Sequence, residues 1–275
     1  MDLEAEYNNR ARVPEHPAII AGWARDAAAF RAAAKAEIDL AYGARPRNRL
    51  DLFWPATDAG GPIVLFIHGG YWRAFDKSSF SHMAAGPNSH GLPVAVAGYT
   101  LCPDSSIPDI IDEMRQAALF LWHRLARPII AIGQSAGGHL AAALLATNWT
   151  AYGAPASIMP AAMAISGIYD LRPLVGLALN ADLKLDERIA ITASPLFWPA
   201  PRGVQFEASV GASESREFIR QSETIIAAWA GLGLDARFVA EEGENHFSIV
   251  RHLANPASPL CTRLQAIALR RSRPL

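Results

Sequence analysis

The segment Gly133–Gly137 reads G-Q-S-A-G and has the pattern G-x-S-x-G, which can carry a nucleophilic serine. It follows an apolar run, Pro128–Ile132, that is typical of a buried strand, and it precedes the Ala/Leu-rich stretch Ala136–Thr147, which is typical of a helix. A serine at such a strand-to-helix turn takes a strained backbone conformation that lifts its hydroxyl above the sheet. The sequence therefore predicts Ser135 as the nucleophile of acyl transfer, against the alternative of an ordinary glycine-rich turn with a capping serine.

A second glycine-rich segment, H-G-G-Y-W at residues 68–72, follows the apolar run Ile63–Ile67. Because glycine has no side chain, the backbone here can approach a ligand closely. The N–H of Ala136, directly after the serine, is expected to serve as one oxyanion-hole donor. The other donors are expected from the backbone of Gly69, Gly70 and Tyr71. His68 is expected to organise this loop rather than to act in catalysis.

A serine nucleophile needs a histidine as its general base. Of the histidines after Ser135, His139 lies too close along the chain to turn back toward it. His246 follows the apolar run Ala236–Ala240 in a short loop, which is where a base would meet the nucleophile. His252 is the alternative and is expected on the surface, so we predict His246.

The base needs a carboxylate that fixes its tautomer. Glu214 follows the predicted strand Gln205–Val210 and a glycine turn, so we predict it as the acid. Asp170, after the predicted strand Ala161–Ser166, and Glu217, about one helical turn further along the chain, are the alternatives. A helix-terminal carboxylate without a catalytic role is the other interpretation of Glu214.

Aromatic residues near these segments are expected either to line a substrate pocket or to pack in the core. They are Tyr71, Trp72, Tyr99, Tyr169 and Phe247. No group of cysteine, histidine and acidic residues has the spacing of a metal site, so we expect no metal and no cofactor. Cys102 and Cys261 have no motif context, and two free thiols are favoured over one disulfide.

The elements that must position these residues alternate along the chain between apolar runs and helical stretches. Further strands are expected at Asn48–Trp54 and Pro93–Gly98, and further helices at 15–37, Ile107–Arg124 and Glu214–Ala230. The helix at 15–37 is expected to pack on the body of the protein or to help cover a pocket. Such alternation predicts an α/β fold with a mainly parallel sheet covered on both faces, whose ligands bind at the carboxyl ends of the strands.

The composition agrees with one globular domain over residues 1–275, with an N-terminal helical segment at about 1–40. Hydrophobic residues make up 51% and charged residues 19% of the chain, which supports a sizeable core. A net charge of −1 gives no electrostatic basis for binding nucleic acid or an anionic membrane. The basic cluster Arg270, Arg271 and Arg273 is expected to be a solvated tail. The polar first residues do not resemble a signal peptide, so a soluble cytoplasmic protein that acts on a small molecule is expected, with a homodimer possible.

Together these motifs resemble the kynurenine formamidase-like branch of the α/β hydrolases, which is related to the hormone-sensitive-lipase-like esterases. The similar segments are F-I-H-G-G-Y-W-R at Phe66–Arg73, G-Q-S-A-G-G-H at Gly133–His139, I-S-G-I-Y-D-L at Ile165–Leu171, G-A-S-E-S-R-E-F at Gly211–Phe218 and N-H-F at Asn245–Phe247. The resemblance implies an α/β-hydrolase fold, a Ser-Asp/Glu-His triad, an H-G-G oxyanion loop and no metal. Two departures concern the substrate: Tyr71 replaces a glycine usual in the lipase-like esterases, and Glu214 stands where formamidases more often carry Asp.

The resulting hypothesis is a serine hydrolase that cleaves a small carboxylic ester or an aryl formamide, such as N-formylkynurenine, through an acyl-enzyme. A general short-chain carboxylesterase needs the same triad and remains open as the first alternative. A binding protein with a hydrolase fold and no activity is the alternative of another class. Loss of the serine, the acid or the histidine would be its signature, and all three are present in this sequence.

Overall fold

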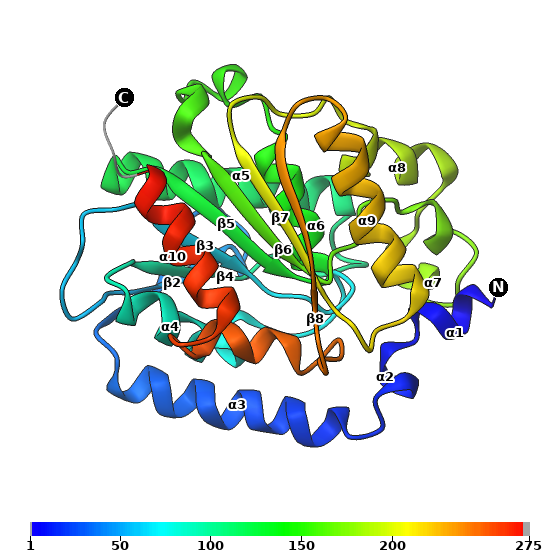
Figure 1. Ribbon diagram of the computed structural model, residues 1–275, viewed down its shortest axis with the longest axis horizontal. Helices are drawn as coiled ribbons and strands as arrows, with labels where there is room; N and C mark the ends of the chain where they lie inside the picture. Colours follow the sequence, from blue (N-terminus) through cyan, green and yellow to red (C-terminus); the bar gives the residue numbers. More distant parts are fainter. Residues whose placement is uncertain (1, 272–275) are drawn as a thin grey trace.

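The apolar runs of the sequence form the strands of one sheet (Figure 1), in a computed structural model that describes residues 2–271. The sheet has 8 strands in the order β1-β2-β4-β3-β5-β6-β7-β8. The strands are β1 (Ala36–Ala41), β2 (Arg49–Phe53), β3 (Ile63–Ile67), β4 (Val94–Ala97), β5 (Ile129–Gln134), β6 (Ala161–Ile165), β7 (Gln205–Gly211) and β8 (Asp235–Glu241). Strand β2 is antiparallel to β1 and β4, and every other pairing is parallel. The expected mainly parallel sheet is therefore confirmed.

Helices cover both faces of this sheet, which explains why its central strands are apolar throughout. The helices are α1 (Leu3–Tyr7), α2 (Asn9–Arg12), α3 (His16–Ala33), α4 (Ala85–Ser89), α5 (Ile107–Leu125), α6 (Ala136–Leu145), α7 (Asn180–Leu183), α8 (Glu187–Thr192), α9 (Arg216–Ala230) and α10 (Pro259–Arg271). Short 3-10 turns include η1 (Lys77–Ala84) and η6 (Ile249–Ala254). Along β3, Leu65 packs in one core with α5, α6 and α9. Its neighbour Phe66 packs in the other core with α3, η1 and α10.

The N-terminal helix is shorter than the sequence pattern indicates. A helix at 15–37 is expected, but α3 ends at Ala33 and the chain turns into the edge strand β1. Pairing with β2 gives that segment its hydrogen-bond partners, which outweighs the helical preference of an alanine-rich sequence. Asp51 of β2 is fully buried and pairs with Arg31 of α3 and with Lys77 of η1, so charge pairing fastens α3 to the body.

Helix α9 also begins later than expected. It starts at Arg216, and the hydroxyl of Ser215 accepts the N–H of Phe218 as its N-cap. Glu214 therefore lies in the turn before the helix rather than in its first turn. That position leaves its carboxylate free to turn toward the residues that follow the neighbouring strand.

The remaining expectations on the body of the protein concern its thiols, its termini and the membrane. Cys102 and Cys261 are both free and buried, as expected. Arg270 is exposed near the end of α10, whereas the side chains of Arg271 and Arg273 lie outside the described part. Within residues 2–271, no helix combines the length and the apolar character that crossing a bilayer requires.

Candidate active site

Ser135 lies at a sharp turn between β5 and α6, where its backbone has φ 57° and ψ −118°. Non-glycine residues rarely adopt such angles, and strain of this kind is common at functional positions. The flanking glycines make the turn possible. A Cβ on Gly133 would lie 2.0 Å from the carbonyl oxygen of Gly137, and one on Gly137 would lie 2.0 Å from that of Ile67. The glycines of the G-x-S-x-G segment are therefore required by close packing between β3, β5 and α6.

His246 and Glu214 form a buried pair at the same edge of the sheet. The His246 Nδ1–H donates to Glu214 Oε2 at 2.7 Å, and the glutamate side chain is completely buried. The other carboxylate oxygen accepts the N–H of Gly211 at 2.8 Å and the hydroxyl of Ser166. Three donors thus hold the carboxylate in place. Because the carboxylate accepts the proton on Nδ1, it favours the His246 tautomer whose Nε2 is unprotonated.

Ser135 and His246 line one cavity of about 560 Å³. The backbone carbonyl of His246 accepts the side-chain N–H of Gln134 at 3.0 Å, so the residue before the serine fixes the histidine loop. The ring of Phe218 packs 4.6 Å from the imidazole, centroid to centroid. Among the described side chains, Ser135 Oγ makes no direct hydrogen bond to the imidazole, and such contacts are often long in unliganded hydrolases.

The alternative acids and the alternative base are engaged elsewhere. Asp170 forms a salt bridge with Arg172 at 2.8 Å. Glu217 pairs with Arg220 and accepts the Tyr7 hydroxyl. His252 lies in the 3-10 turn η6 and not in an α-helix, and its ring contacts the carboxylate of Glu244. Only Glu214, of the three acids weighed, reaches His246.

His68 and His139 are both buried and hydrogen-bonded to backbone carbonyls. His68 donates to the carbonyl of Gly69 at 2.8 Å and stacks on the ring of Tyr99. His139 donates to the carbonyl of Ala193 at 2.7 Å. Burial lowers the pKa of both imidazoles to about 4, because the charged form loses its solvation. Both rings are therefore neutral near pH 7.

The segment after β3 wraps around the nucleophile. Gly70 has φ +105°, Tyr71 has φ +50° and Trp72 has φ +54°, so three consecutive residues have a positive φ. A Cβ on Gly69 would lie 2.5 Å from the Gln134 side-chain oxygen and 3.0 Å from the Cβ of Ser135. Gly70 and Tyr71 line the cavity, whereas Gly69 packs behind the serine.

Two of the five predicted pocket aromatics, Tyr71 and Phe247, do line the cavity. The other expectation, packing in the core, holds for Trp72, Tyr99 and Tyr169, which are completely buried and do not line the cavity. Their surroundings explain this: Trp72 meets the edge of His139, Tyr99 lies on His68, and Tyr169 meets the edge of Phe206. Other aromatic side chains, Tyr7, Trp23 and Phe75, line the cavity in their place.

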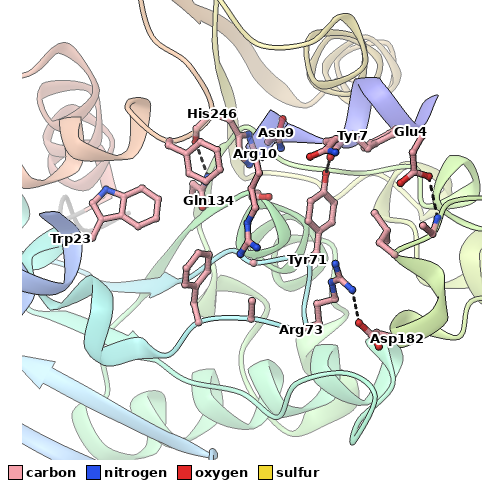
Figure 2. Close-up of a pocket in the computed structure, with 18 residues that line it drawn as sticks. Glu4, Tyr7, Asn9, Arg10, Trp23, Tyr71, Arg73, Gln134, Asp182 and His246 are labelled. Atoms are coloured by element: carbon pink, nitrogen blue, oxygen red, sulfur yellow. Dashed lines mark hydrogen bonds and ion pairs between the residues drawn. The ribbon is translucent and has the colours of Figure 1, made fainter. Parts of the chain in front are cut away.

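The sequence analysis missed the contribution of the N-terminal segment to this cavity. Figure 2 shows Tyr7 of α1 and Asn9 and Arg10 of α2 on one side of His246, and Trp23 of α3 on the other. Trp23 bears out the expectation that the N-terminal helix helps cover a pocket. Residues 2–13 carry no recognisable motif, so no local signal could have placed them there.

The N-terminal segment is fastened by Tyr7. The Tyr7 hydroxyl donates to Glu217 at 2.8 Å and accepts the side-chain N–H of Gln221 at 2.9 Å. The Tyr7 carbonyl accepts the Tyr71 hydroxyl at 2.6 Å. Tyr7 thus joins the glycine-rich loop to α9, the helix that follows Glu214. In residues 2–271, no cluster of three or more metal-binding side chains occurs.

Several known proteins are similar to this chain in sequence or in fold. Residues 50–167 match the family model described as BD-FAE. Kynurenine formamidase of Danio rerio is 30% identical over 226 residues, which cover 79% of this chain and 77% of that protein. The crystal structure of a candidate thioesterase from Silicibacter sp. is 34% identical with a TM-score of 0.89, and covers 98% of this chain and 99% of that one. An esterase from Pyrobaculum calidifontis, 17% identical, shares the fold with a TM-score of 0.71 over 91% of each chain.

Proposed function

Because the chain belongs to the kynurenine formamidase family of the α/β-hydrolase superfamily, we propose that it cleaves a small ester or aryl formamide through an acyl-enzyme on Ser135. The chain is a hydrolase, as its relatives are. This disfavours the alternative of a hydrolase-fold protein without activity. The acyl-enzyme and the roles of individual residues are our proposal.

The observation that carries the proposal is the buried Glu214–His246 hydrogen bond at the rim of the cavity that holds Ser135. A carboxylate that accepts the Nδ1 proton leaves Nε2 unprotonated and able to accept the serine proton. Three elements that are distant in the sequence deliver these groups to one edge of the sheet. An ordinary structural histidine would not require a fully buried carboxylate beside a strained serine.

In the proposed mechanism, His246 Nε2 takes the proton of Ser135 Oγ as the oxygen attacks the substrate carbonyl. The backbone N–H groups of Ala136 and of Gly70 or Tyr71 stabilise the negative charge on the carbonyl oxygen. The leaving alcohol or amine takes its proton from the imidazolium, and the acyl group stays on Ser135. Water then attacks the acyl-enzyme with His246 as base, which releases the acid and restores the serine.

The size of the cavity favours a small substrate. About 560 Å³ is in the range of pockets that hold one small molecule, and the Tyr71 ring occupies part of the wall beside the oxyanion loop. An aryl formamide or a short aryl ester would fit against Phe247 and Tyr71. A thioester is a second candidate substrate, because the 34% identical Silicibacter protein is described as a candidate thioesterase and thioester cleavage uses the same acyl-enzyme.

The test combines a covalent label with rates. A fluorophosphonate should modify Ser135 alone in the folded protein, as located by mass spectrometry of its peptides. Ser135→Ala should remove both the labelling and the hydrolysis of N-formylkynurenine, 4-nitrophenyl acetate and acetyl thioesters, with a rate loss on the order of a millionfold. The rate ratios of the unchanged enzyme for the three substrates then identify the preferred bond. Activity above a few per cent in folded Ser135→Ala would refute the proposal.

A further inference from the structure

Arg10 stands out among the charged side chains that line the catalytic cavity. It lies on α2, is exposed, and belongs to the cavity wall. In Figure 2 its guanidinium reaches toward the centre of the pocket, on the side of Gln134 and His246. Within residues 2–271, it forms no hydrogen bond or ion pair. A cation that enters a pocket without a counter-charge is available to a ligand.

The other charged groups of the cavity already have partners. Arg73 pairs with Asp182, so the two charges cancel. The Glu4 carboxylate accepts the N–H of Ala178 at 3.1 Å. Figure 2 places these groups beyond the Tyr71 ring, away from His246. Of the described cations that line the cavity, Arg73 thus has a paired carboxylate, whereas Arg10 has none.

The residue before Arg10 adds an unused hydrogen-bond donor. Asn9 is 5% exposed and lines the same cavity, and its side-chain amide nitrogen is buried without a partner. A buried N–H group without an acceptor is costly, and it is most often explained by a missing ligand or water.

The backbone that carries these donors is held in place. Tyr7, two residues before Asn9, is 2% exposed and is fixed through three hydrogen bonds to Glu217, Gln221 and Tyr71. A preorganised donor binds a ligand at less entropic cost than one on a free segment. The N-terminal segment is therefore suited to recognise part of the substrate as well as to cover it.

We propose that Arg10, assisted by the amide of Asn9, is a specificity-determining residue that binds a carboxylate on the substrate, away from the bond that is cleaved. A guanidinium and an amide present several N–H groups to the two oxygens of a carboxylate. The preferred substrates are then esters or formamides that carry an anionic group on the side facing the N-terminal segment. This inference rests on the proposed function, since it takes Ser135 as the centre of the reaction.

The experiment compares charged and neutral substrates of equal size. The esters 3- and 4-acetoxybenzoate are each paired with the corresponding neutral acetoxybenzamide. For at least one isomer, Arg10→Gln should lower kcat/KM of the benzoate by roughly 10- to 100-fold, while the benzamide changes by less than about threefold. Arg12→Gln is the matched control: it removes the same charge from the same helix, but Arg12 lies outside the cavity wall and only approaches Glu6 at 3.9 Å.

Two outcomes would overturn the inference while the proposed function stands. One is a benzoate-to-benzamide ratio that Arg10→Gln leaves unchanged for both isomers. The other is an equal fall of that ratio in Arg12→Gln, which would show a general effect of charge. A binding measurement separates the inference from catalysis. Calorimetric titration with 3- and 4-hydroxybenzoate should show weaker binding to the double variant Ser135→Ala/Arg10→Gln than to Ser135→Ala alone. If each compound binds both variants equally well, the inference is refuted, even if no ester is cleaved.

Discussion

Replacing Glu214 by glutamine should disable the histidine while preserving the shape of the site. One carboxylate oxygen of Glu214 accepts the N–H of Gly211, a group that can only donate. The glutamine must therefore keep its single oxygen toward Gly211 and turn its NH₂ group toward His246. That NH₂ group can only donate, so Nδ1 of His246 must become an acceptor. The imidazole proton then moves to Nε2, where it faces Ser135 and blocks the acceptance of the serine proton.

The expected loss in kcat is about ten-thousandfold, or about 5.5 kcal/mol in the activation free energy. The assay is the release of 4-nitrophenolate from 4-nitrophenyl acetate, with circular dichroism and a thermal melt to check the fold. Asp170→Asn is the control, because Asp170 pairs with the half-exposed Arg172 rather than with His246. It should change kcat by less than about threefold. A loss in kcat of less than tenfold in folded Glu214→Gln would refute the assignment of the acid. So would a loss in kcat that is larger in Asp170→Asn than in Glu214→Gln.

Three further perturbations test other parts of the site. Tyr71→Gly removes a ring from the cavity wall, and glycine accepts the φ of +50° at this position. The kcat/KM ratio of hexanoyl over acetyl aryl esters should therefore rise about tenfold. An unchanged ratio would mean that the ring does not limit the size of the acyl group. Gly69→Ala would place a methyl group 2.5 Å from the Gln134 side-chain oxygen and should lower kcat on the order of a hundredfold, whereas a change confined to KM would contradict a role in the oxyanion loop. Burial lowers the pKa of His139 to about 4 in the folded protein, so as the pH falls the imidazole becomes protonated in the unfolded chain before it does in the folded one. The contribution of this residue to the free energy of unfolding should therefore fall by up to roughly 3 kcal/mol between pH 6.5 and pH 4. Urea unfolding of His139→Gln should show a smaller fall over that range, and equal falls would argue against the neutral buried ring.

The elements near the nucleophile could be predicted because their signals are local. The run Ile63–Ile67 matches β3 residue for residue, since a strand buried on both faces is apolar at every position. The G-x-S-x-G segment lies between its predicted strand and helix for the same reason. The edge strand Ala36–Ala41 was missed. It pairs with only one other strand, and its buried and exposed positions do not alternate regularly, so its sequence has no clear strand pattern.

The limits of the prediction lie in contacts between distant segments. Whether a ring lines a pocket or packs in the core depends on its neighbours in space, so the sequence left both possibilities open for Tyr99 and Tyr169, which pack in the core. Arg10 and Asn9 reach the cavity only because Tyr7 docks on α9, more than 200 residues further along the chain. No periodicity or motif in the first residues encodes that docking.

The position of Tyr7 has a consequence for synthesis on the ribosome. Tyr7 emerges early, but its partners Glu217 and Gln221 are made 210 and 214 residues later. Until then the Tyr7 hydroxyl has neither of these partners, although Tyr71, which donates to the Tyr7 carbonyl, is already present. His246 follows later still in the sequence. A nascent chain that stops before α9 therefore carries the nucleophile Ser135 but neither the base nor the roof of the pocket. Under the proposed mechanism, the hydrolase therefore gains activity only after the segment that carries His246 has been made.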